Sequence, residues 1–206
     1  MLALDEILGD SESDAPLLEI ISRQLGKPPR SISGVAAYCS RNAPLVVITR
    51  PLIKKIKGVE PFPTIFWLSC PYLVKEVGRL ESTGLIEEIE FLVSNVPILR
   101  ENLYDAHREY VNARLALLTE EERNLLPREF PGIWRVLVST GVGGVKDWNR
   151  VKCLHAHLAQ FLATGKNPIG YIVSHLMGLD TMVCTSSACF PERRPAAVLE
   201  PGGARI

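Results

Sequence analysis

The chain has 206 residues, which is long enough for one domain with a sizeable hydrophobic core. Hydrophobic residues make up 47% of it and charged residues 22%, a composition that is typical of globular proteins and argues against wholesale disorder. The 23 basic and 23 acidic side chains balance, so no strong overall field favours nucleic acid or an anionic membrane. Nucleic-acid binding through a local basic patch stays open.

The amino-terminal segment 1–14 indicates a cytoplasmic protein. It carries five acidic side chains and lacks the cationic start and apolar run of a signal peptide. The longest apolar stretches, such as residues 65–68, are too short to cross a bilayer, so no membrane association is expected. In the reducing cytoplasm the cysteines are expected to be thiols or metal ligands rather than structural disulfides. They are Cys39, Cys70, Cys153, Cys184 and Cys189.

The first third of the chain predicts one helix and then strands. Apolar residues at helical spacing predict a helix over residues 15–25, which Gly26 ends. Residues 33–38 and 45–49 are predicted to form two short strands, the second rich in β-branched residues. The residues between them are expected to form the turn of a β-hairpin. The apolar run 64–68 predicts a further, buried strand. Residues 54–58 between these strands are expected to form an exposed turn.

Helices are expected over most of the remaining chain. They are predicted at about residues 71–80, 85–93, 98–118, 147–163 and from 168 onwards. Pro71 suits the first turn of the first of these helices. The sequence from Thr119 to Glu122 has the form of a capping box, in which the two side chains bond reciprocally to backbone N–H groups. Residues 134–139 are predicted to form one late strand.

This order of elements predicts an α+β fold, with a small, mostly antiparallel sheet covered by helices. Residues 1–14 are interpreted as an acidic, flexible leader, and residues 15–180 as the single domain. Residues 181–206, rich in Ser, Pro, Arg and Gly, are interpreted as a mobile tail. Cys184 and Cys189 are accordingly expected to take no part in a site.

The segment 153–157 is the most informative for chemistry, because it holds Cys153, His155 and His157 within five residues. Thiolate and imidazole are ligands for zinc, and three thiolates can hold an iron–sulfur cluster. In a regular helix Cys153 and His157 share a face, and His155 joins Cys153 only if Cys153 precedes the first turn. Cys39 and Cys70 end predicted strands and are the expected partners. The alternative is that these cysteines are small apolar residues of the core.

A glycine-rich loop and nearby cations indicate an anion site. Glycines let backbone N–H groups approach a phosphate, and a following helix start attracts it. The candidate residues are Gly141, Gly143, Gly144, Lys146, Arg150 and Lys152. The alternative is a turn that needs glycine for its backbone conformation. Lys75 and Arg79 are interpreted as a solvated helix face, with a basic edge of a pocket near Cys70 as the alternative.

Several motifs together resemble the bacterial family of unknown function number 501 (DUF501). They are residues 62–71 (FPTIFWLSCP), 73–81 (LVKEVGRLE), 141–144 (GVGG), 151–157 (VKCLHAH) and 167–170 (NPIG). The resemblance implies a bacterial cytoplasmic protein whose typical motifs include the thiols Cys39, Cys70 and Cys153 and the imidazole of His155. It therefore favours His155 over His157 as the fourth ligand. The family name implies no activity.

The leading hypothesis is a cytoplasmic protein with a metal centre, either an iron–sulfur cluster or zinc. Its substrate would be an anionic small molecule, phosphorylated or nucleotide-like, and the metal would act as a Lewis acid or as a sulfur-handling centre. One alternative is a non-catalytic adaptor that binds a partner protein and holds a purely structural zinc. The other is a metal-free cysteine enzyme with a histidine base. Whether the protein is an enzyme stays open at this point.

Overall fold

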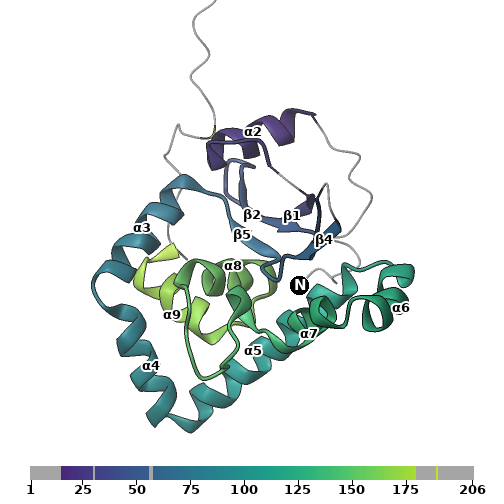
Figure 1. Ribbon diagram of the computed structural model, residues 1–206. Coiled ribbons are helices and arrows are strands. Elements are labelled where there is room, and N and C mark those ends of the chain that lie inside the picture. The colour runs from purple at the N-terminus through teal and green to yellow at the C-terminus, as the bar shows by residue number, and fades with distance from the viewer. Residues whose placement is uncertain (1–14, 30, 56–57, 180–188, 190–206) are drawn as a thin grey trace, which may run out of the picture.

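The computed structural model describes residues 15–29, 31–55, 58–179 and 189 (Figure 1). The strands of this part of the chain are β1 (Ile32–Tyr38), β2 (Pro44–Thr49), β3 (Leu52–Lys55), β4 (Gly58–Pro61) and β5 (Phe66–Leu68). The helices are α2 (Ala15–Leu25), α3 (Pro71–Ser82), α4 (Leu85–Asn95), α5 (Pro97–Ala116), α6 (Glu120–Glu129), α7 (Pro131–Ser139), α8 (Leu154–Thr164) and α9 (Pro168–Leu176). A short 3₁₀ turn, η1 (Val142–Gly144), precedes α8.

The main sheet has three antiparallel strands in the order β1-β2-β5, with Val47 opposite Trp67 in the β2–β5 pair. The strands β3 and β4 form a separate hairpin in which Lys55 pairs with Gly58. In Figure 1 α2 lies above the main sheet and α8 below it, with α3, α4, α5 and α9 around α8. The predicted α+β class, a small antiparallel sheet covered by helices in one domain, is confirmed.

The core lies where α8 packs against the sheet. Side chains alternate between the two faces of a strand, and β2 contributes Val46 and Ile48 to the main core cluster. Leu154 and Leu158 of α8 belong to the same cluster. The buried hydroxyl of Tyr110, from α5, accepts a hydrogen bond from the backbone N–H of Ile65 at 2.8 Å. This bond ties α5 to the residue just before β5, an edge strand of the main sheet.

Arg114 is a fully buried cation that joins α5 to the end of α7. Its guanidinium donates to backbone carbonyls and lies over the Tyr110 ring, 5.2 Å from the centroid. Burial lowers the pKa of Arg114 to about 10, so the group stays charged at neutral pH. The accepting carbonyls are those of Pro63, Leu137, Thr140 and Gly141, at 2.7 to 3.0 Å. Arg114 thus satisfies carbonyls at the end of α7 that a helix leaves open, and holds the loop that follows.

The predicted strand at residues 134–139 is wrong, because these residues belong to α7. Pro131 occupies the first turn of this helix, where its missing N–H costs nothing. Ile133, Trp134 and Leu137 then pack into a second core cluster at helical spacing. The β-branched residues of the segment favour a strand locally, and this packing overrides that preference.

Two further expectations about local structure are corrected. Of residues 54–58, predicted as an exposed turn, Lys54 and Lys55 belong to β3 and Gly58 to β4, and residues 56–57 lie outside the described residues. The helix predicted from residue 147 begins only at Leu154. The capping box is confirmed: the Thr119 hydroxyl accepts from the Glu122 N–H at 3.1 Å, and the Glu122 carboxylate accepts from the Thr119 N–H at 2.9 Å.

The proposed leader 1–14 and most of the proposed tail 181–206, Cys184 included, lie outside the described residues. Cys189 is described, and it is buried, with its sulfur 3.1 Å from the amide nitrogen of Gln24 on α2. At this residue the tail therefore contacts the domain. Among the described helices, none has the length and apolar character needed to span a membrane.

Candidate functional site

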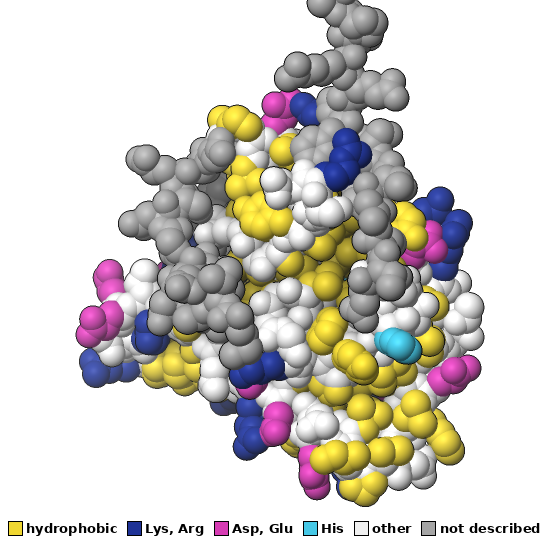
Figure 2. Space-filling view, turned by 180° about the vertical axis from the view of Figure 1, so that it is seen from behind, with side chains coloured by type: hydrophobic (Ala, Val, Ile, Leu, Met, Phe, Trp, Pro, Cys, Tyr) yellow, Lys and Arg dark blue, Asp and Glu magenta, His cyan; other side chains and the backbone are white. Residues whose placement is uncertain are grey.

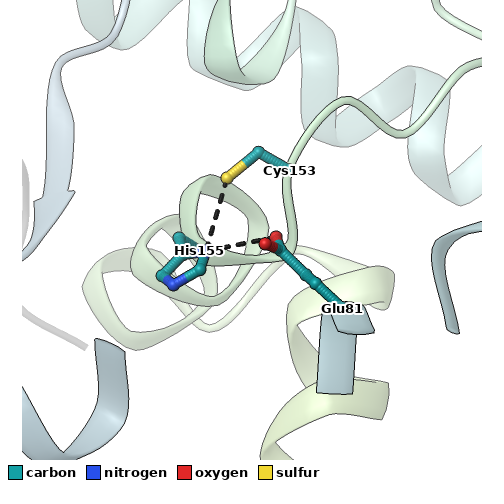
Figure 3. A group of neighbouring side chains, drawn as sticks. All are labelled: Glu81, Cys153 and His155. Atoms are coloured by element: carbon teal, nitrogen blue, oxygen red, sulfur yellow. Dashed lines mark hydrogen bonds and ion pairs between the residues drawn. The ribbon is translucent and has the colours of Figure 1, made fainter. Parts of the chain in front are cut away.

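Helices α3 and α8 bring together three side chains with metal-binding atoms: Glu81, Cys153 and His155 (Figure 3). One donor atom from each lies within 4.8 Å of the others. Glu81 stands in the last turn of α3, and Cys153 occupies the residue just before the first turn of α8. In that extended conformation Cys153 turns its sulfur towards His155, the second residue of the helix, as Figure 3 shows. This is the arrangement in which His155, rather than His157, shares a site with Cys153.

Glu81 caps α8 from outside that helix. Its Oε1 accepts a hydrogen bond from the backbone N–H of Leu154 at 2.7 Å, one of the N–H groups that a helix start leaves without a partner. The Cys153 side chain makes no capping bond of its own. The same Oε1 lies 3.1 Å from Nδ1 of His155. One carboxylate oxygen therefore stabilises the helix start and faces the imidazole.

The backbone of α3 fixes the orientation of the His155 ring. Nε2 lies 3.0 Å from the carbonyl oxygen of Val74, which can only accept, so Nε2 carries a hydrogen and donates it. Nδ1 then faces both the Cys153 sulfur, at 3.6 Å, and the Glu81 carboxylate. The hydrogen bond with Cys153, followed by the Val74 carbonyl and the charges of Cys153 and Glu81, raises the pKa of His155 to about 9 against the opposing effect of burial.

These contacts define what can occupy the space between the three side chains. A lone pair on Nδ1 would repel the carboxylate oxygen 3.1 Å away, so this contact favours a proton or a metal cation between the two atoms. In the metal-free protein the raised pKa of His155 favours the imidazolium, whose second proton takes this place. A metal cation in the same place would meet one oxygen, one sulfur and one nitrogen, a donor set used by zinc.

A groove of about 1150 Å³ opens beside Cys153 and His155. Its walls come from the end of α2 and residues 27–29, from the sheet, from the start of α3, and from the residues around the start of α8. The residues that line it include Leu25, Lys27, Pro28, Pro29, Ile32, Phe62, Trp67, Lys75, Gly143 and Lys152. The group of three side chains therefore borders a space large enough for an organic ligand.

The structure places the other two predicted thiols outside this group. Cys39 follows β1, and its sulfur lies 3.4 Å from the backbone nitrogen of Arg41. Cys70 is buried in the main core cluster just before α3. Among the described residues, the thiols of Cys39, Cys70 and Cys153 do not come within 4.8 Å of one another as a set of three. An iron–sulfur cluster on these thiols stays a prediction.

His157 belongs to the core. Its Nδ1 lies 3.0 Å from the Asn167 amide nitrogen, and that amide also donates to Gln160 at 2.7 Å. Burial, followed by the nearby His107, lowers the pKa of His157 to about 3, so the ring is neutral. The network joins α8 to the first turn of α9, where the Asn167 oxygen accepts from the Gly170 N–H. His157 therefore has a structural environment, and the metal-binding group contains His155 instead.

The glycine loop 141–144 is a tight turn whose N–H groups are mostly occupied. The N–H of Gly141 bonds to the Val145 carbonyl, that of Gly144 to the Gly141 carbonyl, and that of Val142 to Nδ1 of buried His107. Gly143 and Gly144 have φ angles of 63° and 76°, which favour glycine. The loop leads into bends and a turn over residues 146–149 and not directly into a helix. Few of its N–H groups remain for an anion.

The cations predicted beside this loop have different surroundings. Lys152 lines the groove, and its Nζ donates to the Gly143 carbonyl at 3.1 Å. Arg150 pairs with Glu90 at 3.1 Å, and Lys146 is exposed and does not line the groove. Lys75 of α3, interpreted from the sequence as part of a solvated face, lines the groove together with Lys152.

Glu81 is the site residue that the sequence reasoning missed. A carboxylate in the last turn of a helix is unfavourable with respect to the helix dipole, and this was the available signal that it serves another element. Its partner Leu154 lies 73 residues further along the chain. Glu81 and Leu154 come into contact only because α3 packs against α8.

A family model described as "Protein of unknown function (DUF501)" matches residues 35–175. The chain belongs to this family. The matched region includes the site residues Glu81, Cys153 and His155 and most of the groove. No curated protein matches the chain. No solved structure matches it either. The DUF501 assignment confirms the predicted resemblance and adds no activity.

Proposed function

We propose that this DUF501 protein binds a single divalent metal ion, zinc in the first place, through Glu81, Cys153 and His155. The observation that carries the proposal is the orientation of His155. Its Nε2–H is engaged by the Val74 carbonyl at 3.0 Å, which directs Nδ1 to the sulfur and the carboxylate. Metal-binding histidines typically donate their other N–H to a carbonyl or carboxylate in this way.

The position of the site supports a catalytic rather than a purely structural metal. Structural zinc sites have four protein ligands, whereas catalytic sites have three and leave a position for water or substrate. Here three side chains with metal-binding atoms lie together, and two of them, Cys153 and His155, also line the groove. A metal bound there would act as a Lewis acid on a ligand in the groove or on water. We propose such a role in the cytoplasm, where the thiol stays reduced.

Two alternatives have observations in their favour. The Cys153–His155 distance of 3.6 Å would also suit a metal-free enzyme in which the imidazolium stabilises a nucleophilic thiolate. Figure 2 shows hydrophobic side chains gathered on the lower part of the face seen from behind, where α4, α5 and α9 lie. Exposed residues of these helices include Phe91, Ile98, Tyr171 and Leu176, and such a surface suits an adaptor that binds a partner protein.

The test is metal binding by the full-length protein after removal of metal with a chelator. Zinc titration against a competing indicator is expected to show one equivalent bound. Cys153→Ala and His155→Ala should each weaken binding by more than the about 10- to 100-fold typical of changes outside the ligand set. Cys39→Ala is the matched control, a partly buried cysteine outside the group, and should bind zinc like the parent protein.

The other outcomes decide between the alternatives. Loss of metal in Cys39→Ala as well as in Cys153→Ala would overturn the proposed ligand set in favour of the three-thiol centre. No zinc binding, together with fast alkylation of Cys153 that His155→Ala slows, would support the metal-free cysteine enzyme. Zinc binding with four protein ligands would support the adaptor.

A further inference from the structure

The lysines among the described residues that line the groove are Lys27, Lys75 and Lys152. None of the described lining residues is Asp or Glu. The whole chain has equal numbers of basic and acidic residues, so this one-sided lining is a local feature. Concave sites lined by charge of one sign concentrate ligands of the opposite sign. The groove therefore favours an anionic ligand.

Two of these lysines lie beside helix starts at the end of the groove that holds Cys153 and His155. Lys75 is in the first half of α3, and Lys152 comes two residues before α8. Both helices begin at the groove, since Pro71 and Cys153 line it. Helix starts carry partial positive charge, and at α8 the Glu81 carboxylate already caps this charge. The dipole of α3 therefore adds to the field of the lysines.

Another part of the groove is apolar and presents an aromatic ring held in place. Trp67 stacks on Phe62 with ring centroids 5.4 Å apart and planes 4° apart. Its indole N–H donates to the Thr64 carbonyl at 2.9 Å, so the ring needs no polar partner from a ligand. The side chain remains 39% exposed. Leu25, Pro28, Pro29 and Ile32 add further apolar surface to the lining.

We propose that the groove binds an organic phosphate with an apolar or aromatic body. The phosphate lies at Lys75 and Lys152, next to Cys153 and His155, and the body lies against Trp67. Ligand sites commonly measure about 300 to 1,000 Å³, so a space of about 1150 Å³ holds such a molecule and exceeds what inorganic phosphate fills. The inference deepens the proposed function, because the phosphate would lie beside the proposed metal ion, but its lysines and its aromatic platform are independent of that metal.

The experiment is calorimetric titration of the full-length protein, metal-free and zinc-loaded, with four probes. They are 1-naphthyl phosphate, 1-naphthol, 1-naphthoate and inorganic phosphate. Naphthyl phosphate is expected to bind at least about tenfold more tightly than each of the others. It alone combines a phosphate group for the lysines with an aromatic body for Trp67. Its affinity should fall as salt is raised, as expected for partly exposed charges.

Variants test which residues carry the binding. Lys75→Gln and Lys152→Gln should each lower the affinity for naphthyl phosphate by about 3- to 10-fold, the effect of losing one charged hydrogen bond at a wet site. Lys146→Gln is the matched control, because Lys146 is exposed and outside the groove lining, and should change nothing. Trp67→Ala should weaken naphthyl phosphate and leave inorganic phosphate unaffected.

Equal affinity for naphthyl phosphate and inorganic phosphate would overturn the apolar half of the proposal, and equal affinity for naphthoate would overturn the assignment to phosphate. An unchanged affinity in both lysine variants would place binding elsewhere. The metal-free arm separates this inference from the proposed function. Binding of naphthyl phosphate by a protein that takes up no zinc would support the proposed ligand of the groove and overturn the metal site. Zinc uptake without binding of naphthyl phosphate would support the metal site and overturn the proposed ligand of the groove.

Discussion

Acidification is expected to destabilise the fold through two buried histidines of the core, His107 and His157. Burial lowers the pKa of His107 from its ordinary value of 6.5 to about 4, and that of His157 to about 3. Both rings are therefore neutral in the folded protein, whereas in the unfolded chain they take up protons as the pH falls below 6.5. The unfolded state binds more protons in this range, so the free energy of unfolding falls with falling pH.

The magnitude follows from the pKa difference. Each pKa unit is worth about 1.4 kcal/mol, so His107 alone removes about 3 kcal/mol of stability between pH 6.5 and 4. The loss stops below the folded-state pKa, where both states are protonated. Because a domain of this kind is commonly stable by only about 5 to 15 kcal/mol, the effect is large enough to measure.

The assay is urea unfolding at pH 7, 5.5 and 4 of the parent protein, His107→Asn and His175→Gln. His107→Asn is expected to be less stable at pH 7, because the Val142 N–H loses its imidazole partner, but to lose about 3 kcal/mol less than the parent on going to pH 4. His175 is exposed on α9, so His175→Gln should follow the parent. A His107→Asn profile parallel to that of the parent would show that His107 is not held neutral by the fold.

The remaining predictions concern stability at neutral pH and are measured by the same unfolding assay. Gly141→Ala should destabilise by about 3 kcal/mol, because the new Cβ would lie 2.3 Å from Nδ1 of His107, a rigid buried ring; an effect below about 1 kcal/mol would contradict the packing described. Gly78→Ala, in the middle of α3 with nothing within 4 Å of the new Cβ, should stabilise by about 0.5 to 1 kcal/mol, and destabilisation would contradict the open space there. Thr119→Ala should cost about 1 kcal/mol by removing one half of the capping box with Glu122, and an unchanged midpoint would show that the cap contributes little.

Local signals allowed much of the fold to be predicted from the sequence. Thr119 marks a helix start because its side chain accepts a hydrogen bond from one of the first backbone N–H groups. Pro71 and Pro168 mark helix starts because proline lacks the N–H group that would have no partner there. Both signals act within one turn. The segment 134–139 could not be assigned correctly in this way. Its β-branched run resembles a strand, and only packing against Leu126 and Leu118 in the second core cluster makes it helical.

The candidate site was predicted in part. The compact Cys153–His155 pair indicated where metal-binding atoms gather, and both belong to the group that the structure brings together. Glu81 could not be predicted, because the packing of α3 on α8 is decided by the whole core and not by residues near either helix end. Cys70, which was expected beside Cys153, instead serves the core at the start of α3.

X-ray absorption at the zinc edge of the zinc-loaded, full-length protein tests the central claim most directly. Binding by Glu81, Cys153 and His155 predicts one sulfur ligand at about 2.3 Å and the remaining nitrogen and oxygen ligands at about 2.0 to 2.2 Å. In Cys153→Ala the sulfur contribution should disappear. Two or three sulfur ligands in the parent protein, or a sulfur contribution that survives in Cys153→Ala, would contradict the site between α3 and α8.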